Sequence, residues 1–287
     1  MKIKGWKYYN HAAIPDTAPH EQPDITPIED GTIWQLDGSP LLARWTTDFD
    51  CEQETNWWYV IKDAPFDINA LKAKRRYEIN KGNKNFYVEE INPIEWVENI
   101  YDVAVAAYAT YPESYRPDVS HDQFVSDIKK WSFHKVYGAY SVADKSFCGF
   151  ACLRKAGSYI DFCVMKADPE KERLGVNAAI VYKILEDHDE FLTSGGFICD
   201  GARSVNHETA FQEYLEKYYG FRKAFCKLHI AYNPKLKLAI KFLYPIRKIL
   251  LVGDKCGLIH QINSVLRMEE IVRENNGKYG INNNAIV

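Results

Sequence analysis

The stretch KERLGVNAAIVYKIL, from Lys171 to Leu185, determines how the rest of the sequence is interpreted. A charged run ends at Leu-Gly-Val-Asn, and an apolar stripe follows, with Ala178, Val181 and Leu185 on one helical face. A glycine before a helix lets a backbone approach a ligand closely, and the first helical turn offers unpaired N–H groups. The stretch therefore predicts a loop and a helix start suited to a phosphate or diphosphate.

Two common phosphate-binding motifs do not fit this stretch. A Walker A loop needs a second glycine followed by Lys-Ser or Lys-Thr, and the dinucleotide motif needs three spaced glycines. Neither pattern occurs around Gly175. The ligand is therefore expected to be held by backbone groups at the helix start.

Composition limits the class of protein. The chain has 287 residues, a formal net charge of −3 and no run of apolar residues long enough to cross a membrane, so neither DNA binding nor a transmembrane helix is expected. The N-terminus lacks the apolar core of a signal peptide, which predicts a cytoplasmic protein. The seven cysteines include no CxxC pair, and most lie in apolar strand-like runs, so we expect reduced, buried thiols.

The order of elements between residues 85 and 233 predicts the fold class. Strands are expected at 85–91, 135–142, 146–155, 158–166, 195–202 and 221–233, and helices at 94–111, 120–131, 176–185 and 206–221. A helix that links two strands implies parallel neighbours, whereas short hairpin links imply antiparallel ones. The sequence therefore predicts an α/β protein with a mixed sheet flanked by helices.

The flanking segments predict further parts. We expect an extended arm over 1–30 and a strand and helix subdomain over 31–84, with strands at 31–36, 40–45 and 56–62 and a basic helix at 67–83 ended by Gly82-Asn83. The mixed-sheet domain covers 85–235. A helical extension over 236–275 and a disordered tail over 276–287 follow.

The element order and the residues ERLGVNAAIVYKIL resemble the GNAT acyltransferase superfamily. Its signature, [Q/R]-x-x-G-x-[G/A], opens the helix after the fourth strand. With Gly175 as its first glycine, Glu172 stands at the Q/R position, Asn177 at the final position, and Arg173 one residue late. The downstream SVNHETAFQEYLEKYYGF is similar to the closing helix of the superfamily, with Glu216 where a tyrosine is usual.

The segment LKAKRRYEINKGNKNFYVEEI is similar to the one that precedes the transferase domain in the Fem-like branch of this superfamily. That branch attaches amino acids or acyl groups to amino groups of cell-envelope precursors and related substrates. The resemblance covers residues 30 to 235 and identifies 85–235 as a GNAT-like acyltransferase domain.

The resemblance implies a particular cofactor site. The fourth strand and the next parallel strand splay apart at one end, which frees backbone groups for a pantetheine arm or a developing oxyanion. The diphosphate of coenzyme A (CoA) is expected on the N–H groups from Leu174 to Ala178. The implied contacts are Cys163, Val164, Met165, Arg173, Leu174, Gly175, Val176, Asn177, Ala178 and Asn206.

Four side chains are candidates for catalysis. Asp161 interrupts an apolar strand near the expected splay and is the first candidate for the general base, with an ion pair to Arg154 as the alternative. Asp200 ends its strand and is the second, with a turn-forming Asp-Gly as the alternative. Tyr214 and Tyr218 could protonate a leaving thiolate or simply fill the core.

Two basic segments have alternative interpretations. Arg75 and Arg76 lie on the basic helix, which either contacts an anionic substrate or is a solvated face. The segment KLKLAIKFLYPIRKILL, residues 235–251, either packs its apolar side onto the protein or lies on an anionic membrane surface. No His, Cys and Asp cluster has metal-ligand spacing, so no metal is expected.

The first hypothesis is an N-acyltransferase that moves an acyl group from acetyl-CoA or another acyl-CoA to an amino group of a small molecule or of an envelope or polysaccharide precursor. A Fem-like transferase with an aminoacyl-tRNA donor is the second. A non-catalytic relative that binds an envelope component is the third.

Overall fold

A computed structural model describes residues 1–113, 116–117, 120–205, 210–250 and 257–279. The chain divides into two compact units. The terminal unit comprises Met1–Val60, Ala202–Ala210 and Lys223–Val287, and the central unit comprises Ile61–Gly201 and Phe211–Arg222. The linear division at residues 30, 84, 235 and 275 stays a prediction.

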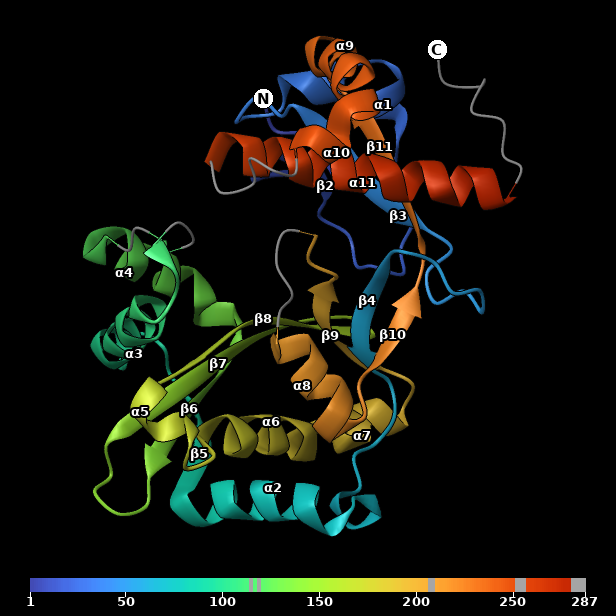
Figure 1. Cartoon of the computed structure of the whole chain (residues 1–287). Helices are drawn as coiled ribbons and strands as arrows, with labels where there is room; N and C mark the ends of the chain where they lie inside the picture. The colour runs from blue at the N-terminus through green and yellow to red at the C-terminus, as the bar shows by residue number, and fades with distance from the viewer. Residues whose placement is uncertain (114–115, 118–119, 206–209, 251–256, 280–287) are drawn as a thin grey trace. The chain divides into compact units, whose positions relative to one another are not determined.

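The central unit is built on a seven-stranded sheet with the order β10-β4-β9-β8-β7-β6-β5 (Figure 1). The chain passes between the two units at four places, within β4, β9, α8 (Ala210–Tyr219) and β10. The strands are β4 (Trp58–Lys62), β5 (Phe86–Ile91), β6 (Lys135–Ser141), β7 (Phe147–Ala156), β8 (Tyr159–Ala167), β9 (Phe197–Ala202) and β10 (Arg222–Phe225). From β5 to β8 the neighbours are antiparallel, whereas β8 and β9 are parallel, so the predicted mixed sheet is confirmed.

The helices follow the predicted order, with short additional turns. They are η2 (Ile68–Ala70), α2 (Ala73–Asn85), α3 (Val97–Ala109), α4 (His121–Lys129), η4 (Lys130–Phe133), α5 (Pro169–Glu172), α6 (Val176–Asp187), α7 (Asp189–Thr193) and α8 (Ala210–Tyr219). α3 begins at Val97 rather than directly after Pro93. The side chain of Asn92 accepts a hydrogen bond from the N–H of Ile94, and this bond forms a turn before the helix.

Helices cover both faces of this sheet. On one face, α3 packs its buried Ile100, Val103 and Ala104 against Phe150 and Cys152 of β7. On the other face, α6 crosses the sheet beneath β6 to β8, and α2 lies outside α6 (Figure 1). α6 is held there because Ile180, Val181 and Ile184 are buried.

A bulge and a splay shape the carboxyl end of β8. Cys152 pairs with Val164 and Leu153 with Phe162, so Cys163 has no partner across the ladder. On its other side, β8 pairs with β9 through only three residue pairs, the last being Asp161 with Cys199. The two strands therefore separate beyond Asp161, as the superfamily resemblance implies. Cys163, predicted to be buried, is exposed because it occupies the bulge.

Two glycines bring α2 and α6 into backbone contact. A Cβ atom on Gly82 would lie 2.5 Å from the carbonyl oxygen of Gly175 and 3.0 Å from the nitrogen of Ala179. The predicted end of the basic helix at Gly82-Asn83 is therefore wrong. The helix continues to Asn85, and Gly82 is required for close approach rather than for termination.

The terminal unit contains a four-stranded sheet with the order β1-β2-β3-β11. Its elements are β1 (Trp6–Tyr9), β2 (Ala12–Pro15), α1 (Thr26–Glu29), η1 (Thr32–Gln35), β3 (Leu42–Thr47), β11 (Lys227–Tyr232), α9 (Pro234–Leu243), η5 (Tyr244–Ile246), α10 (Arg247–Leu250) and α11 (Gly257–Tyr279). The first thirty residues, predicted to be an extended arm, include the hairpin of β1 and β2. The last α11 residues fall within the predicted disordered tail.

Two strand predictions are wrong in this unit. Residues 31–36 contain the 3-10 helix η1 instead of a strand, and this helix buries Ile33. The single strand expected over 221–233 is interrupted at Cys226, whose N–H donates to the carbonyl oxygen of Trp57 and whose own carbonyl accepts from Thr55. These bonds end β10, and β11 then joins the other sheet beside β3.

No helix in the described part of the chain combines the length and apolar character needed to cross a membrane.

The Gly82 contact predicts the effect of a single methyl group. Alanine normally stabilises a helix interior by about 1 kcal/mol relative to glycine. At Gly82 the added Cβ meets backbone atoms that cannot rotate away, so overpacking outweighs propensity and Gly82→Ala should lower the free energy of unfolding by about 1–2 kcal/mol. Denaturant unfolding measures this change. The exposed neighbouring variant Asn83→Ala is the control; equal or greater stability of Gly82→Ala would contradict the close contact.

Candidate functional site

Asp161 lies where the pairing of β8 with β9 ends. Its carboxylate accepts a hydrogen bond from the guanidinium of Arg154, with 3.1 Å between the two atoms. The two residues are directly opposite on the β7–β8 ladder. The ion pair that the sequence leaves as an alternative is therefore present.

Asp200 is the first residue of β9 beyond the last pair with β8, and it is half-buried. The pKa of its carboxyl group is raised to about 7, mainly by burial and in smaller part by the negative charge of Asp161. A hydrogen bond from the Gln212 side chain and the charge of Lys166 act in the opposite direction. Of the two predicted carboxylates, Asp200 thus has the environment of a proton acceptor at neutral pH.

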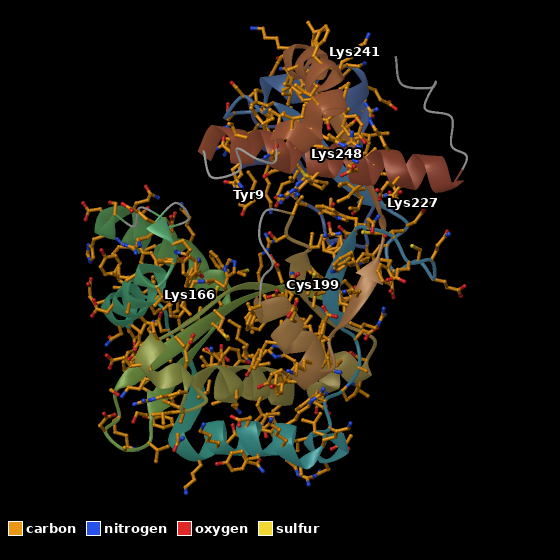
Figure 2. All side chains as sticks on the ribbon, viewed as in Figure 1. Tyr9, Lys166, Cys199, Lys227, Lys241 and Lys248 are labelled. Atoms are coloured by element: carbon orange, nitrogen blue, oxygen red, sulfur yellow. The ribbon has the colours of Figure 1, made fainter. Side chains whose placement is uncertain are left out.

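Three residues around these carboxylates were missed by the sequence reasoning. Lys166 of β8 donates to the hydroxyl of Tyr111 over 2.9 Å, and Gln212 comes from α8. His134 has a buried Nδ1 without a hydrogen-bond partner among the described residues, and burial lowers its pKa. Lys166 and Cys199, which flank the site on β8 and β9, are labelled in Figure 2. No local spacing links these residues, because each lies on a different element.

The backbone from Cys163 to Met165 has no ladder partner on the β9 side. Cys163 lies on the bulge, and its Sγ is 3.7 Å from a carboxylate oxygen of Asp161. The segment that the superfamily resemblance assigns to the pantetheine arm is therefore adjacent to Asp161. Backbone donors at such a position can hold a carbonyl oxygen that gains negative charge.

The start of α6 offers fewer free groups than expected. The N–H of Leu174 donates to Lys171 and that of Gly175 to Glu172, each over 2.9 Å. No acceptor is found, within the residues that the structure describes, for the N–H groups of the first three helical residues, Val176, Asn177 and Ala178. The N–H groups of Leu174 and Gly175 thus already have acceptors, and a diphosphate contact at these two residues stays a prediction.

Two charged side chains near the start of α6 have opposite effects on the binding of a phosphate. The carboxylate of Glu172 accepts from the Asn177 side chain over 3.4 Å and would repel a phosphate, although it is favourable for the helix dipole. Arg173 is exposed one residue later and could attract one. Gly175 itself has a φ of 94°, a left-handed conformation that favours glycine.

Tyrosines link α8 to the first turn of α6. The Tyr214 hydroxyl lies 3.1 Å from that of Tyr219, which in turn donates to the carbonyl of Ala178 over 3.3 Å. Burial raises the pKa of Tyr214 to about 12. Tyr218 instead stacks under the guanidinium of Arg75, 5.7 Å from its ring centre. Tyr219, which the sequence reasoning did not select, is thus the α8 tyrosine that donates a hydrogen bond to α6.

The remaining predicted residues are placed separately. Arg76 donates to the carbonyl of Asn69 over 3.4 Å, so it stabilises the turn before α2. Asn206 lies outside the described residues. Within the described ranges, no three His, Cys, Asp or Glu side chains form a group that could hold a metal ion.

Comparison with known proteins shows the fold. No family model matches the chain, and no curated protein matches it by sequence. The structure of L-PGS from Bacillus licheniformis is similar with a TM-score of 0.51 and 12% identity, over 85% of this chain and 84% of that one. A conserved protein of unknown function from Bacteroides thetaiotaomicron gives a TM-score of 0.51 at 12% identity, over 77% and 78% of the chains. FemX gives 0.48 at 9% identity, over 76% and 81%.

The chain therefore has a GNAT-like fold, and the predicted fold class is confirmed. Identities this low concern the fold alone. The roles of the individual site residues stay predictions.

The raised pKa of Asp200 predicts how stability depends on pH. Between the ordinary value of 3.8 and about 7, the folded protein keeps a proton that the unfolded chain has lost, so this group makes folding less favourable as pH rises. Asp200→Asn removes the penalty. The free energy of unfolding of the variant, relative to that of the native chain, should increase by no more than about 4 kcal/mol between pH 4 and 7. Above pH 7 this difference should stay constant.

Urea unfolding at several pH values measures this difference. Gln212→Leu is the matched background, because it removes a hydrogen bond that favours the ionised Asp200 carboxyl. In this background the stability gained by Asp200→Asn should continue to increase with pH above pH 7. A difference that does not change with pH would contradict a raised pKa at Asp200.

Proposed function

We propose that this chain transfers an acyl group to an amine at the splay between β8 and β9. The observation that carries the proposal is Asp200, a half-buried carboxyl with a pKa of about 7, placed immediately beyond the last β8–β9 pair. An amine must lose a proton before or during its attack on a carbonyl carbon. A carboxylate that accepts protons near neutral pH suits this task.

The reaction uses the groups around the splay as follows. The amine nitrogen attacks the acyl carbonyl, a C–N bond forms, and Asp200 takes the proton from nitrogen. Unpaired backbone N–H groups near the Cys163 bulge stabilise the negative oxygen of the tetrahedral intermediate. The bond to the leaving thiolate or alkoxide then breaks, and the Tyr214 hydroxyl gives it a proton. The tyrosinate regains a proton from solvent, and Asp200 releases to solvent the proton that it took from nitrogen.

Asp161 supports Asp200 rather than acting as the base. It forms an ion pair with Arg154, and its negative charge raises the pKa of Asp200. Two neighbouring carboxyl groups with different environments can thus take different roles.

For the donor we propose acyl-CoA, with acetyl-CoA as the simplest case. Three free N–H groups at the start of α6 and the exposed Arg173 can together contact a diphosphate. The acyl end of the donor would then reach the splay along the unpaired edge of β8.

An aminoacyl-tRNA donor is a second candidate, supported by a separate observation. The negative charge of Glu172 disfavours a CoA diphosphate at the start of α6. The close approach of Gly82 to Gly175 limits the room there. The adjoining α2 carries cations that suit a nucleic-acid backbone. They are Lys74, Arg75, Arg76, Lys81 and Lys84.

The acceptor we propose is an amino group on a small molecule or an envelope precursor. Arg75 and Arg76 are candidates for contacts with an anionic part of it, since a guanidinium that stacks on a ring or makes one hydrogen bond still has free donors.

Kinetics of carboxyl variants test the base. With acetyl-CoA and an amine acceptor identified from a panel of amino sugars, amino acids and polyamines, thiol release measures turnover. Asp200→Asn should lower kcat/KM by roughly 100-fold or more. For the native enzyme, kcat/KM should fall as pH drops below about 7, because Asp200 becomes protonated.

Asp161→Asn is the matched variant in this experiment. It removes a neighbouring negative charge, so the acid limb of the pH profile should move to lower pH while most activity is kept. Unaltered turnover in Asp200→Asn would remove Asp200 from the mechanism.

Calorimetric titration distinguishes the donors. Acetyl-CoA and free CoA should bind the native chain, and Arg173→Glu should weaken both by about tenfold, because it places a negative charge beside the diphosphate. Lys129→Glu, at an exposed site on α4, is the charge-matched control. Failure of both ligands to bind the folded protein, with binding of a charged tRNA, would reject acyl-CoA in favour of the second donor.

A further inference from the structure

The helical segment Pro234–Leu250 of the terminal unit has two apolar faces. It consists of α9, η5 and α10, which follow one another without a gap. One face packs inward: Ile240 is 4% exposed, and Leu236 packs against the core that includes Leu228 and Met268. The predicted packing of this segment onto the protein accounts for that face alone.

The second face is an exposed row of large apolar side chains, which we call the apolar stripe. Leu238, Phe242, Ile246 and Ile249 are exposed by 60%, 68%, 45% and 71%. Their spacing of four, four and three residues places them along one side of a helix. Single exposed apolar residues are common on proteins, but an aligned row of four is characteristic of a binding surface.

Lysines flank the apolar stripe. Lys235, Lys237, Lys241 and Lys248 are exposed, and no Asp or Glu occurs between residues 234 and 250. None of the four has a carboxylate within salt-bridge distance among the described residues. Figure 2 labels Lys241 and Lys248 on this segment. The local charge is thus strongly positive, although the whole chain has a net charge of −3.

A hollow beside the apolar stripe adds to this charge. It has a volume of about 380 Å³ and is lined by Lys237, Lys241 and Arg273. Its one acidic residue, Glu269, forms an ion pair with Arg273 and accepts a hydrogen bond from the Tyr232 hydroxyl. The hollow therefore leaves two lysines available to an anionic group from outside.

We propose that Pro234–Leu250 docks on the surface of an anionic phospholipid bilayer. The apolar stripe enters the boundary between headgroups and acyl chains, and the four lysines contact lipid phosphates with their aliphatic stems along the boundary. The segment is roughly 25 Å long and lies in the plane of the membrane. This docking is independent of the chemistry proposed at the splay.

Charge complementarity selects this occupant over a second copy of the chain. Two copies that met through the apolar stripe would bring their lysine rows together without a compensating acid on either segment. Like charges across an interface oppose association. An anionic bilayer instead supplies both an apolar layer and a dense sheet of negative charge.

Vesicle co-sedimentation of the full chain tests the proposal. We expect binding to vesicles of phosphatidylcholine mixed with phosphatidylglycerol, and at least tenfold weaker binding to phosphatidylcholine alone. The double variant Phe242→Ser with Ile249→Ser should lose at least tenfold in affinity. Phe133→Ser, which alters a 96% exposed aromatic residue on η4 of the central unit, is the control and should bind as the native chain does.

The lysines are tested in the same assay. Lys241→Gln with Lys248→Gln should weaken binding to the anionic vesicles, and so should added salt, whereas Lys129→Gln should not. Failure of the folded chain to bind anionic vesicles would overturn the proposal. Equal binding of the Phe242 and Ile249 double variant would overturn it as well. If sedimentation equilibrium showed the native chain to be a dimer and the Phe242 and Ile249 double variant to be a monomer, the apolar stripe would be assigned to contact with a second copy instead.

Discussion

The structure of the candidate site depends on the short pairing between β8 and β9. Only three residue pairs join these parallel strands, and the Cys163 bulge disrupts β8 directly beyond them. A bulge increases the local twist of a strand, so the two strands cannot continue side by side. Both carboxylates lie at the point of separation, Asp161 in the last pair and Asp200 one residue further. Their different surroundings follow from this placement, because Asp161 faces Arg154 across the ladder, whereas burial raises the pKa of Asp200.

A second constraint positions the start of α6. The contact between Gly82 and Gly175 fixes α2 against the first turn of that helix, and the Tyr219 hydroxyl holds the same turn from α8 through the carbonyl of Ala178. Two independent contacts thus immobilise the turn that presents the free N–H groups. A rigid turn is what a diphosphate site needs, since donors that are already oriented need not be reorganised when a ligand binds. The same contacts limit the room around Gly175.

The sequence predicts the fold better than it predicts the site. Alternating apolar patterns locate β5 to β9, and their order with α3, α6 and α8 predicts a mixed sheet, because these signals lie within single elements. The pairing of Asp161 with Arg154 is also within reach of sequence reasoning, since a short hairpin places the two residues opposite one another. By contrast, the sequence predicts that a helix ends at Gly82, because a glycine needed for close packing has the same local signal as one that terminates a helix.

Other features have no local signal at all. The single strand expected over 221–233 is divided by hydrogen bonds to Cys226 from residues about 170 positions earlier in the chain. Lys166, Gln212 and His134 join the site from three elements, so no spacing could reveal them. The environment that raises the pKa of Asp200 likewise arises from tertiary burial, which its position at the end of a strand only suggests.

The most direct measurement of the central claim is the titration of the Asp200 carboxyl group by carbon-13 NMR, assigned by comparison with Asp200→Asn. A midpoint near pH 7 that moves lower in Asp161→Asn is the predicted result, because burial and the neighbouring charge both favour the protonated form. A midpoint near the ordinary aspartate value of 3.8, in a protein shown to be folded, would contradict the assignment of Asp200 as the proton acceptor at the splay.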